Sequence, residues 1–230
     1  MKRMKRSDLA EANISQQFCV DNIAELLACC ADPKEPVESR IQACDAIALL
    51  KPINATAALL EAANSSKVEV ATAAIGALSL IGSKKATRSL MSIVRRSPIE
   101  AIRGSAICCL GHLCDKRAEE LVSRVLSQAS SSNTRCYATQ ALSRLATRDR
   151  SFRLLLKSLR DKVPLVRWNV IVALDTLGDL RAIPSLQALC LDDAPVLELP
   201  DRETVGAAAK RVLKELQSPD FCRRIVVRLR

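Results

Sequence analysis

The sequence predicts an all-α fold built from a stack of helical hairpins. Apolar residues make up 49% of the 230 residues but aromatic residues only 2%, so small aliphatic side chains must fill the core. The chain contains only six glycines, which argues against a protein rich in strands or loops. A short apolar motif also recurs at nearly constant spacing, which is the signature of a repeat array.

The recurring motif pairs a small residue with an aliphatic one and places a second aliphatic residue three positions later. It is clearest at 173–178, which reads ALDTLG, and it recurs at 46–50, 77–82, 109–113 and 141–145. The successive steps are 31, 32, 32 and 32 residues, and a looser copy at 205–212 follows after a longer step of 35. Each copy lies within an apolar stripe of helical spacing.

The predicted elements follow in order along the chain. Residues 1–17 form a basic N-terminal tail, and residues 18–36 form a capping helix or half repeat. Each later unit contains a first helix that carries the motif and a second amphipathic helix. The array covers residues 37–230, with units near 37–67, 68–98, 99–131, 132–164, 165–201 and 202–230.

The breaks between paired helices have their own signature. Gly82 and Gly178 stand where a left-handed residue closes the first helix. Ser66 and Glu69 form a capping-box pattern at the start of the first helix that Gly82 closes. One position after the glycines, a column of residues has side-chain oxygens that cap free N–H groups at a helix start: Ser83, Asp115, Thr147 and Asp179.

The composite pattern V-R-x-x-x-x-x-A-L-x-x-L-G-D-x-R-A-x-x-x-L resembles the HEAT-repeat family, in particular the short HEAT-like repeats of phycobilisome lyases. The resemblance extends from about Val37 to the end of the sequence. It implies a right-handed α-solenoid, or superhelix, of about five to six hairpins, with the second helices lining the concave side. Such repeats serve many proteins, so the resemblance predicts the fold and not the function.

An arginine column recurs near the start of the first helices. In HEAT-like repeats this arginine ties neighbouring units together through carbonyls and acidic turns, so the resemblance implies a structural role. A ladder of anion-binding sites is the alternative, and it is favoured less because guanidinium forks suit fixed interfaces. The column contains Arg40, Arg103, Arg135, Arg167 and Arg202.

A second set of cations falls in the turns between paired helices, about one repeat apart along one predicted edge. Such residues are either ordinary solvated turn residues or a docking edge for an acidic partner or a phosphate backbone. Trp168, the sole tryptophan, is a candidate surface aromatic. The edge contains Lys84, Lys85, Lys116, Arg117, Arg148, Arg150 and Arg181.

The net charge of +10 is concentrated at the two ends of the sequence. Eight lysines and arginines within 2–6 and 223–230 leave only +2 for the residues between them. Nucleic-acid binding through the basic tails and turns is therefore an alternative, but the few aromatics offer little for base stacking. No apolar run is long enough to span a membrane. Ten cysteines without framework spacing predict a reducing cytoplasm.

The one ligand-like cluster is Cys108, Cys109, His112 and Cys114. The repeat register places Cys109 in the core, which predicts buried thiols beside a surface histidine rather than a zinc site. His112 is the only histidine, and no nucleophile and base stand in a catalytic pattern. We therefore expect no catalytic residues, no metal and no cofactor.

The sequence predicts a non-enzymatic scaffold or adaptor that binds another protein through the solenoid groove and the basic turn edge. An acidic protein is one candidate partner, and a membrane is not. A bilin lyase subunit or related phycobiliprotein-handling factor is the alternative that the resemblance implies. The acidic connection at 191–201 is either a binding element or a self-packed connector, with Val196, Leu197 and Leu199 as its apolar residues.

Overall fold

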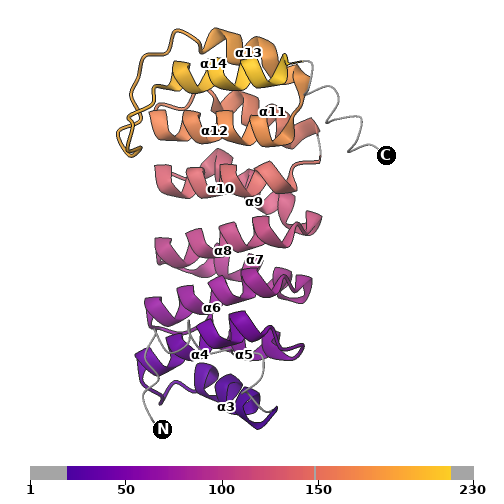
Figure 1. Cartoon of the computed structure of the whole chain (residues 1–230), viewed down its shortest axis with the longest axis vertical. Helices are drawn as coiled ribbons and strands as arrows, with labels where there is room; N and C mark the ends of the chain where they lie inside the picture. The colour runs from indigo at the N-terminus through magenta and orange to yellow at the C-terminus, as the bar shows by residue number, and fades with distance from the viewer. Residues whose placement is uncertain (1–19, 148, 219–230) are drawn as a thin grey trace. The chain divides into compact units, whose positions relative to one another are not determined.

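A computed structural model describes residues 20–147 and 149–218 (Figure 1). In these ranges the chain contains twelve α-helices, three short 3-10 helices and no strand, so the predicted all-α class is confirmed. The described residues form two compact units, divided between Leu113 and Cys114. The predicted basic tails and Arg148 lie outside the described residues.

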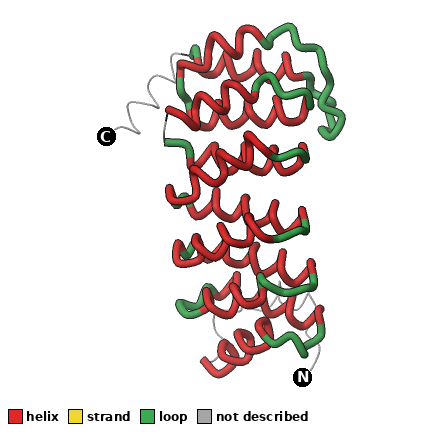
Figure 2. The backbone as a smooth tube through the Cα atoms, turned by 180° about the vertical axis from the view of Figure 1, so that it is seen from behind, coloured by secondary structure: helices red, strands yellow, loops and turns green. Residues whose placement is uncertain are grey.

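The first unit is a run of stacked helical hairpins. The first helices α4, α6 and α8 pack side by side, and the second helices α3, α5 and α7 pack against α4, α6 and α8 respectively (Figures 1 and 2). Its elements are α3 (Val20–Ala31), α4 (Val37–Leu50), α5 (Ala55–Ala62), α6 (Val68–Ile81), η1 (Lys84–Ala86), α7 (Thr87–Arg96) and α8 (Glu100–Leu113).

The second unit repeats this arrangement. The first helices α10, α12 and α14 form one row, while α9 packs against α10 and α11, and α13 packs against α14. Its elements are η2 (Lys116–Ala118), α9 (Glu119–Gln128), α10 (Ser132–Leu145), α11 (Asp149–Ser158), α12 (Pro164–Leu177), η3 (Leu180–Ala182), α13 (Ile183–Ala188) and α14 (Val205–Leu216).

The repeated apolar motif forms the core of each unit. Its aliphatic residues Leu78, Leu110, Leu142 and Leu174 are fully buried. The first helices from α4 to α12 are each 14 residues long and begin 31 or 32 residues apart. Each buried leucine stabilises the fold by about 1.5–3 kcal/mol of transfer free energy. A single hairpin cannot bury these side chains alone, so the stabilisation requires a neighbouring hairpin to pack against them. The stacking therefore follows from the motif.

The helix ends agree with most of the predicted breaks. Gly82 and Gly178 adopt left-handed backbone conformations with φ of 73° and 66°, as predicted, and their N–H groups close α6 and α12. Asp115 and Asp179 cap η2 and η3 by accepting the N–H of the residue two positions later. Ser83 makes no such bond.

Two further predicted caps, Thr147 and Ser66, are wrong. The hydroxyl and N–H of Thr147 donate to the carboxylate of Glu119 in α9, at 2.8 and 3.1 Å, so Thr147 binds a neighbouring hairpin instead. Ser66 does not cap α6, whose N-cap is Lys67. Ser65 takes over part of that role, because its hydroxyl accepts the Lys67 N–H at 3.2 Å.

No helix in residues 20–147 and 149–218 combines the length and the apolar character that a membrane span requires.

Candidate functional site

The arginine column forms a hydrogen-bonded ladder along the connections between hairpins. In the second unit, Arg135 binds both carboxylate oxygens of Asp161, at 2.7 and 2.9 Å. Its remaining nitrogen donates to the carbonyls of Ala129 and Ser130, at 3.0 and 2.8 Å. A single guanidinium thus joins the connection before α10 to the connection after α11.

Arg167 repeats this geometry one hairpin further along. It forks onto the carboxylate of Asp192, at 2.8 and 3.2 Å, and donates to the backbone carbonyl of Asp161 at 2.7 Å. Burial of the Asp161 carboxyl group raises its pKa. Its hydrogen bonds to Arg135 and to the Val163 N–H, together with the positive charges of Arg135 and Arg167, lower the pKa by more, so the pKa lies below its ordinary value. Asp161 therefore links two successive arginines.

In the first unit the column makes fewer bonds. Arg40 is buried, and it donates to the Cys30 carbonyl at 3.1 Å and to the Ser65 hydroxyl at 3.3 Å. Arg103 donates to the carbonyls of Ser97 and Pro98, each at 2.9 Å. These bonds are the kind that the structural interpretation of the column requires.

Arg202 does not belong to the ladder, which corrects the alignment of the last repeat. It is exposed, it has a φ of 50°, and it precedes α14, whereas the ladder arginines are the fourth residues of their helices. The connection before α14 is longer than the other connections, so a residue matched by its sequence spacing does not occupy the equivalent position in the last repeat. At this junction Gly206 donates its N–H directly to the Asp192 carbonyl at 2.7 Å.

Several cations of the predicted basic edge bind groups within the second unit. Lys116 donates to the last carbonyls of α10, and Arg117 forms a bidentate pair with Asp115. Arg181 binds Asp179 and, at 2.9 Å, Asp149, and it lies 4.6 Å from the centre of the Phe152 ring. These side chains fix the turns that carry them.

The other described members of the edge are exposed. Lys84 and Lys85 lie in η1 of the first unit, and Arg150 lies in the first turn of α11. Partner binding at the edge stays a prediction.

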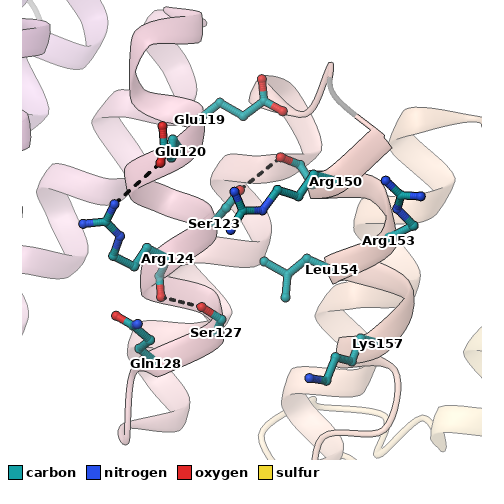
Figure 3. Close-up of a pocket in the computed structure, with 11 residues that line it drawn as sticks. Glu119, Glu120, Ser123, Arg124, Ser127, Gln128, Arg150, Arg153, Leu154 and Lys157 are labelled. Carbon is teal, nitrogen blue, oxygen red and sulfur yellow. Dashed lines mark hydrogen bonds and ion pairs between the residues drawn. The ribbon is translucent and has the colours of Figure 1, made fainter.

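A groove lies between α9 and α11 in the second unit (Figure 3). Its volume is about 370 Å³. The hydroxyls of Ser123 and Ser151 meet at 3.0 Å across it, and Leu154 extends from α11 toward α9. The residues that line it are Glu119, Glu120, Ser123, Arg124, Ser127, Gln128, Arg150, Ser151, Arg153, Leu154 and Lys157.

The α11 wall of this groove carries three exposed cations: Arg150, Arg153 and Lys157. Their i, i+3, i+7 spacing places them on one face of the helix. None of the three forms an ion pair within the residues that the structure describes. On the opposite wall, Arg124 lies 3.6 Å from Glu120. The groove is therefore positively charged along α11.

Of these three cations, only Arg150 belongs to the predicted basic edge. The sequence predicts Arg150 in a turn, whereas it lies in the first turn of α11, at the start of the stripe that Arg153 and Lys157 continue. Phe152, Leu155 and Leu159 are the buried apolar residues of this stretch, and their spacing is visible in the sequence. The helix face opposite these apolar residues is the exposed one, so their spacing predicts that Arg150, Arg153 and Lys157 lie together on it.

Trp168 is not a free aromatic surface. Its indole nitrogen donates to Glu203 at 2.7 Å, and Arg211 binds the same carboxylate from α14 at 3.2 Å. The side chain is half-buried, so it fastens the end of the 191–203 connection to α12.

The prediction of buried thiols beside a surface histidine is correct only for Cys109, because Cys108 is half-buried and Cys114 is exposed. Cys109 is buried, which raises the pKa of its thiol to about 12. His112 is exposed, and its Nδ1 lies 2.9 Å from the Cys108 carbonyl. In the part of the chain that the structure describes, no three His, Cys, Asp or Glu residues are grouped so that they could hold a metal ion.

Comparisons with known proteins extend this description. The HEAT-repeat family model matches residues 23–111 and 119–199. No curated protein sequence is significantly similar to the chain. A designed armadillo repeat protein in complex with the peptide (KR)4 is similar in structure, with a TM-score of 0.54 and 14% identity over 83% of this chain and 99% of that chain.

Two further solved structures are similar. One is an engineered protein, with a TM-score of 0.52 and 16% identity over 85% of this chain and 96% of that chain. The other is the complex of CpcE and CpcF of phycocyanin lyase from Nostoc sp. PCC7120, with a TM-score of 0.49 and 18% identity over 85% of this chain and 82% of that chain. At these identities the structural similarities concern the fold alone. Since the family model covers well over half of the sequence, the chain belongs to the HEAT-repeat family.

Proposed function

We propose that this protein is a non-enzymatic scaffold of the cytoplasm that binds an acidic segment of a partner protein in the groove between α9 and α11. The observation that carries the proposal is the stripe of Arg150, Arg153 and Lys157, three exposed cations that have no ion-pair partner in the described residues. A HEAT-repeat fold supports binding because its hairpins leave long surfaces between the second helices.

The dimensions of the groove suit an extended peptide. Residues 150 and 157 are separated by about 10.5 Å along the helix, at 1.5 Å per residue. Acidic side chains at alternate positions of an extended chain are about 6.6 Å apart, close to the spacing of about 4.5–6 Å between successive cations along the helix. Arginine binds carboxylates with two parallel hydrogen bonds, which favours carboxylates over other acceptors.

The lining also contains groups that suit the backbone of a peptide. Ser127 and Gln128 are exposed on the α9 wall, and they offer a hydroxyl and an amide that exchange hydrogen bonds with peptide groups. Leu154 provides an apolar contact between the cations. Such a mixture supports recognition of a polypeptide, and the lining includes no histidine or cysteine that would support catalysis.

Fluorescence anisotropy with a labelled peptide that alternates glutamate and leucine tests the proposal. We expect the combined substitution Arg150→Glu, Arg153→Glu and Lys157→Glu to weaken binding about tenfold or more, since three favourable charge interactions become repulsive. The matched control replaces Arg88, Arg95 and Arg96, three exposed cations of α7, by glutamate and should leave the affinity unchanged.

Equal weakening by the groove and control variants would contradict the proposal, because it would reflect net charge alone. A DNA duplex of the same length serves as a second probe. If the duplex binds more tightly than the peptide and loses affinity in the groove variant, the groove is a nucleic-acid site and the protein proposal is wrong. The bilin-lyase alternative rests on fold similarity alone, and we do not propose it.

A further inference from the structure

Large apolar side chains are exposed at few places in the described residues, and these places are not scattered evenly. Three of the side chains lie in the first unit near the ends of α4 and α6, and two lie in the connection between α13 and α14. Leu180 in η3 is the sixth. The full set is Leu49, Ile53, Leu80, Leu180, Leu191 and Leu197. Exposed apolar groups that cluster, rather than occur singly, indicate an interaction surface.

The first cluster forms what we call the apolar edge, which consists of Leu49, Ile53 and Leu80. Leu49 and Leu80 are the thirteenth residues of α4 and α6, two helices that pack side by side. Neighbouring packed helices have axes about 8–10 Å apart, so equivalent positions present adjacent side chains. Ile53, in the turn after α4, is completely exposed, with a relative exposure of 102%.

Exposed lysines lie in the turns beside the apolar edge. Lys51 ends α4, and Lys85 lies in η1, which contacts α5. Both are exposed to solvent. The edge is thus an apolar surface with positive charges beside it, which suits a partner that combines aliphatic and acidic side chains.

The second cluster belongs to an acidic loop, residues 191–203. The loop contains five acidic residues and one arginine, so its net charge is −4. Leu191 and Leu197 are 91% and 68% exposed, and Glu198 and Asp201 are exposed near Leu197. The loop therefore presents aliphatic and acidic side chains together, which is the chemistry that the apolar edge requires.

The acidic loop is held in a defined conformation by its base. Val196 is fully buried, and its N–H donates to the Glu203 carbonyl at 3.1 Å. Pro195 and Thr204 face each other in an isolated antiparallel bridge. Glu203 is fixed in turn by Trp168 and Arg211. A preformed loop loses little conformational entropy on binding, which favours its use as a ligand.

We propose that the acidic loop of one copy of this protein docks on the apolar edge of a second copy. Leu197 contacts Ile53 and Leu80, and Glu198 faces Lys85. Because the two surfaces belong to different units of the chain, the contact is heterologous. One copy keeps its edge free and the other keeps its loop free, so the pair can bind further copies. The surfaces are small, so association depends on protein concentration.

Sedimentation velocity over a wide concentration range tests this proposal. The wild-type protein should increase in mean mass as the concentration rises. Ile53→Asp destroys the edge, Leu197→Asp destroys the loop, and both residues are exposed, so both variants should fold and stay monomeric. An equimolar mixture of the two variants should form a 1:1 dimer, since each copy supplies the surface that the other lacks. A monomeric wild-type protein, or a mixture that does not associate, would overturn the proposal.

Charge exchange identifies the contact. Lys85→Glu and Glu198→Lys should each weaken association about tenfold or more, because a favourable pair becomes repulsive, and the two substitutions together should restore it. Failure of the double variant to associate more tightly than either single variant would rule out this pairing. If the groove variant of α11 loses self-association while Lys85→Glu retains it, the loop binds the groove and the apolar edge is not its site.

Discussion

Asp161 shows how much of the repeat architecture depends on single polar residues. Its carboxylate holds Arg135, its backbone carbonyl accepts from Arg167, and its Oδ1 accepts the Val163 N–H at 2.9 Å. The Arg135 and Asp161 side chains are only 11% and 13% exposed. If either side chain is lost, the other is left as a buried charge without a counter-ion. The free-energy cost of that unpaired charge is larger than the net stabilisation that the ion pair provides. The residue therefore acts as a joint between successive hairpins.

Replacement of Asp161 by asparagine should lower the free energy of unfolding by about 3 kcal/mol at neutral pH, because it leaves the Arg135 charge largely buried without its counter-ion. Urea denaturation measures this change. The control is Asp193→Asn, an exposed acid in the same unit, which should change stability by less than about 0.5 kcal/mol. Equal effects of the two substitutions would show that Asp161 contributes only its charge.

Acidic pH should lower the free energy of unfolding of the wild-type protein through protonation of Asp161. The folded-state pKa of Asp161 lies below the ordinary value of 3.8, so its contribution is complete above about pH 4 and is lost as the pH falls through the folded value. The stability of Asp161→Asn should therefore fall less steeply across that window. Denaturation curves between pH 2 and 6 check the prediction, which fails if the two slopes coincide.

At the scale of the helix, two glycines of α6 have opposite roles. Gly76 lies inside the helix, whereas Gly82 closes it in a left-handed conformation with φ of 73°. An added methyl group would meet no atom within 4 Å at either position. Any difference between alanine substitutions at the two positions must therefore come from the backbone.

Gly76→Ala should stabilise the protein by about 0.5–1 kcal/mol, because alanine favours a helix interior. Gly82→Ala should destabilise it by about 1–2 kcal/mol, because a Cβ atom opposes a positive φ. Thermal unfolding of the two variants measures both signs. Shifts in the same direction would show that α6 does not end at Gly82 as described.

The elements were largely predictable because they depend on local periodicity. The buried series Leu78, Leu110, Leu142 and Leu174 shows the spacing of the repeats directly in the sequence. Predictions failed where a tertiary contact decided the outcome. Thr147 matches the capping pattern, but the nearby Glu119 captures its hydroxyl, and no local rule anticipates that contact.

The candidate site was less predictable than the fold. A cation in a turn resembles a free charge in the sequence, yet Arg181 and Lys116 bind groups 32 and 28 residues away. Conversely, Arg153 and Lys157 look like ordinary helix-surface residues until α9 is placed beside α11. Grooves in a repeat protein are made by residues about one repeat apart, so they emerge only when the stacking is known.

For the molecule as a whole, the repeat construction predicts that damage stays local. In an array of hairpins, each hairpin contacts mainly its neighbours, so stability is approximately a sum of nearest-neighbour terms.

The substitution Arg135→Ala tests this expectation. It removes the hydrogen bonds that join the connection before α10 to the connection after α11. Hydrogen exchange under native conditions should accelerate in α10, α11 and α12. It should remain at the wild-type rate in α4 and α6, where Arg40 makes the equivalent bonds. Arg40→Ala should give the reverse pattern. Uniform acceleration along the chain in both variants would mean that the protein unfolds as one cooperative body.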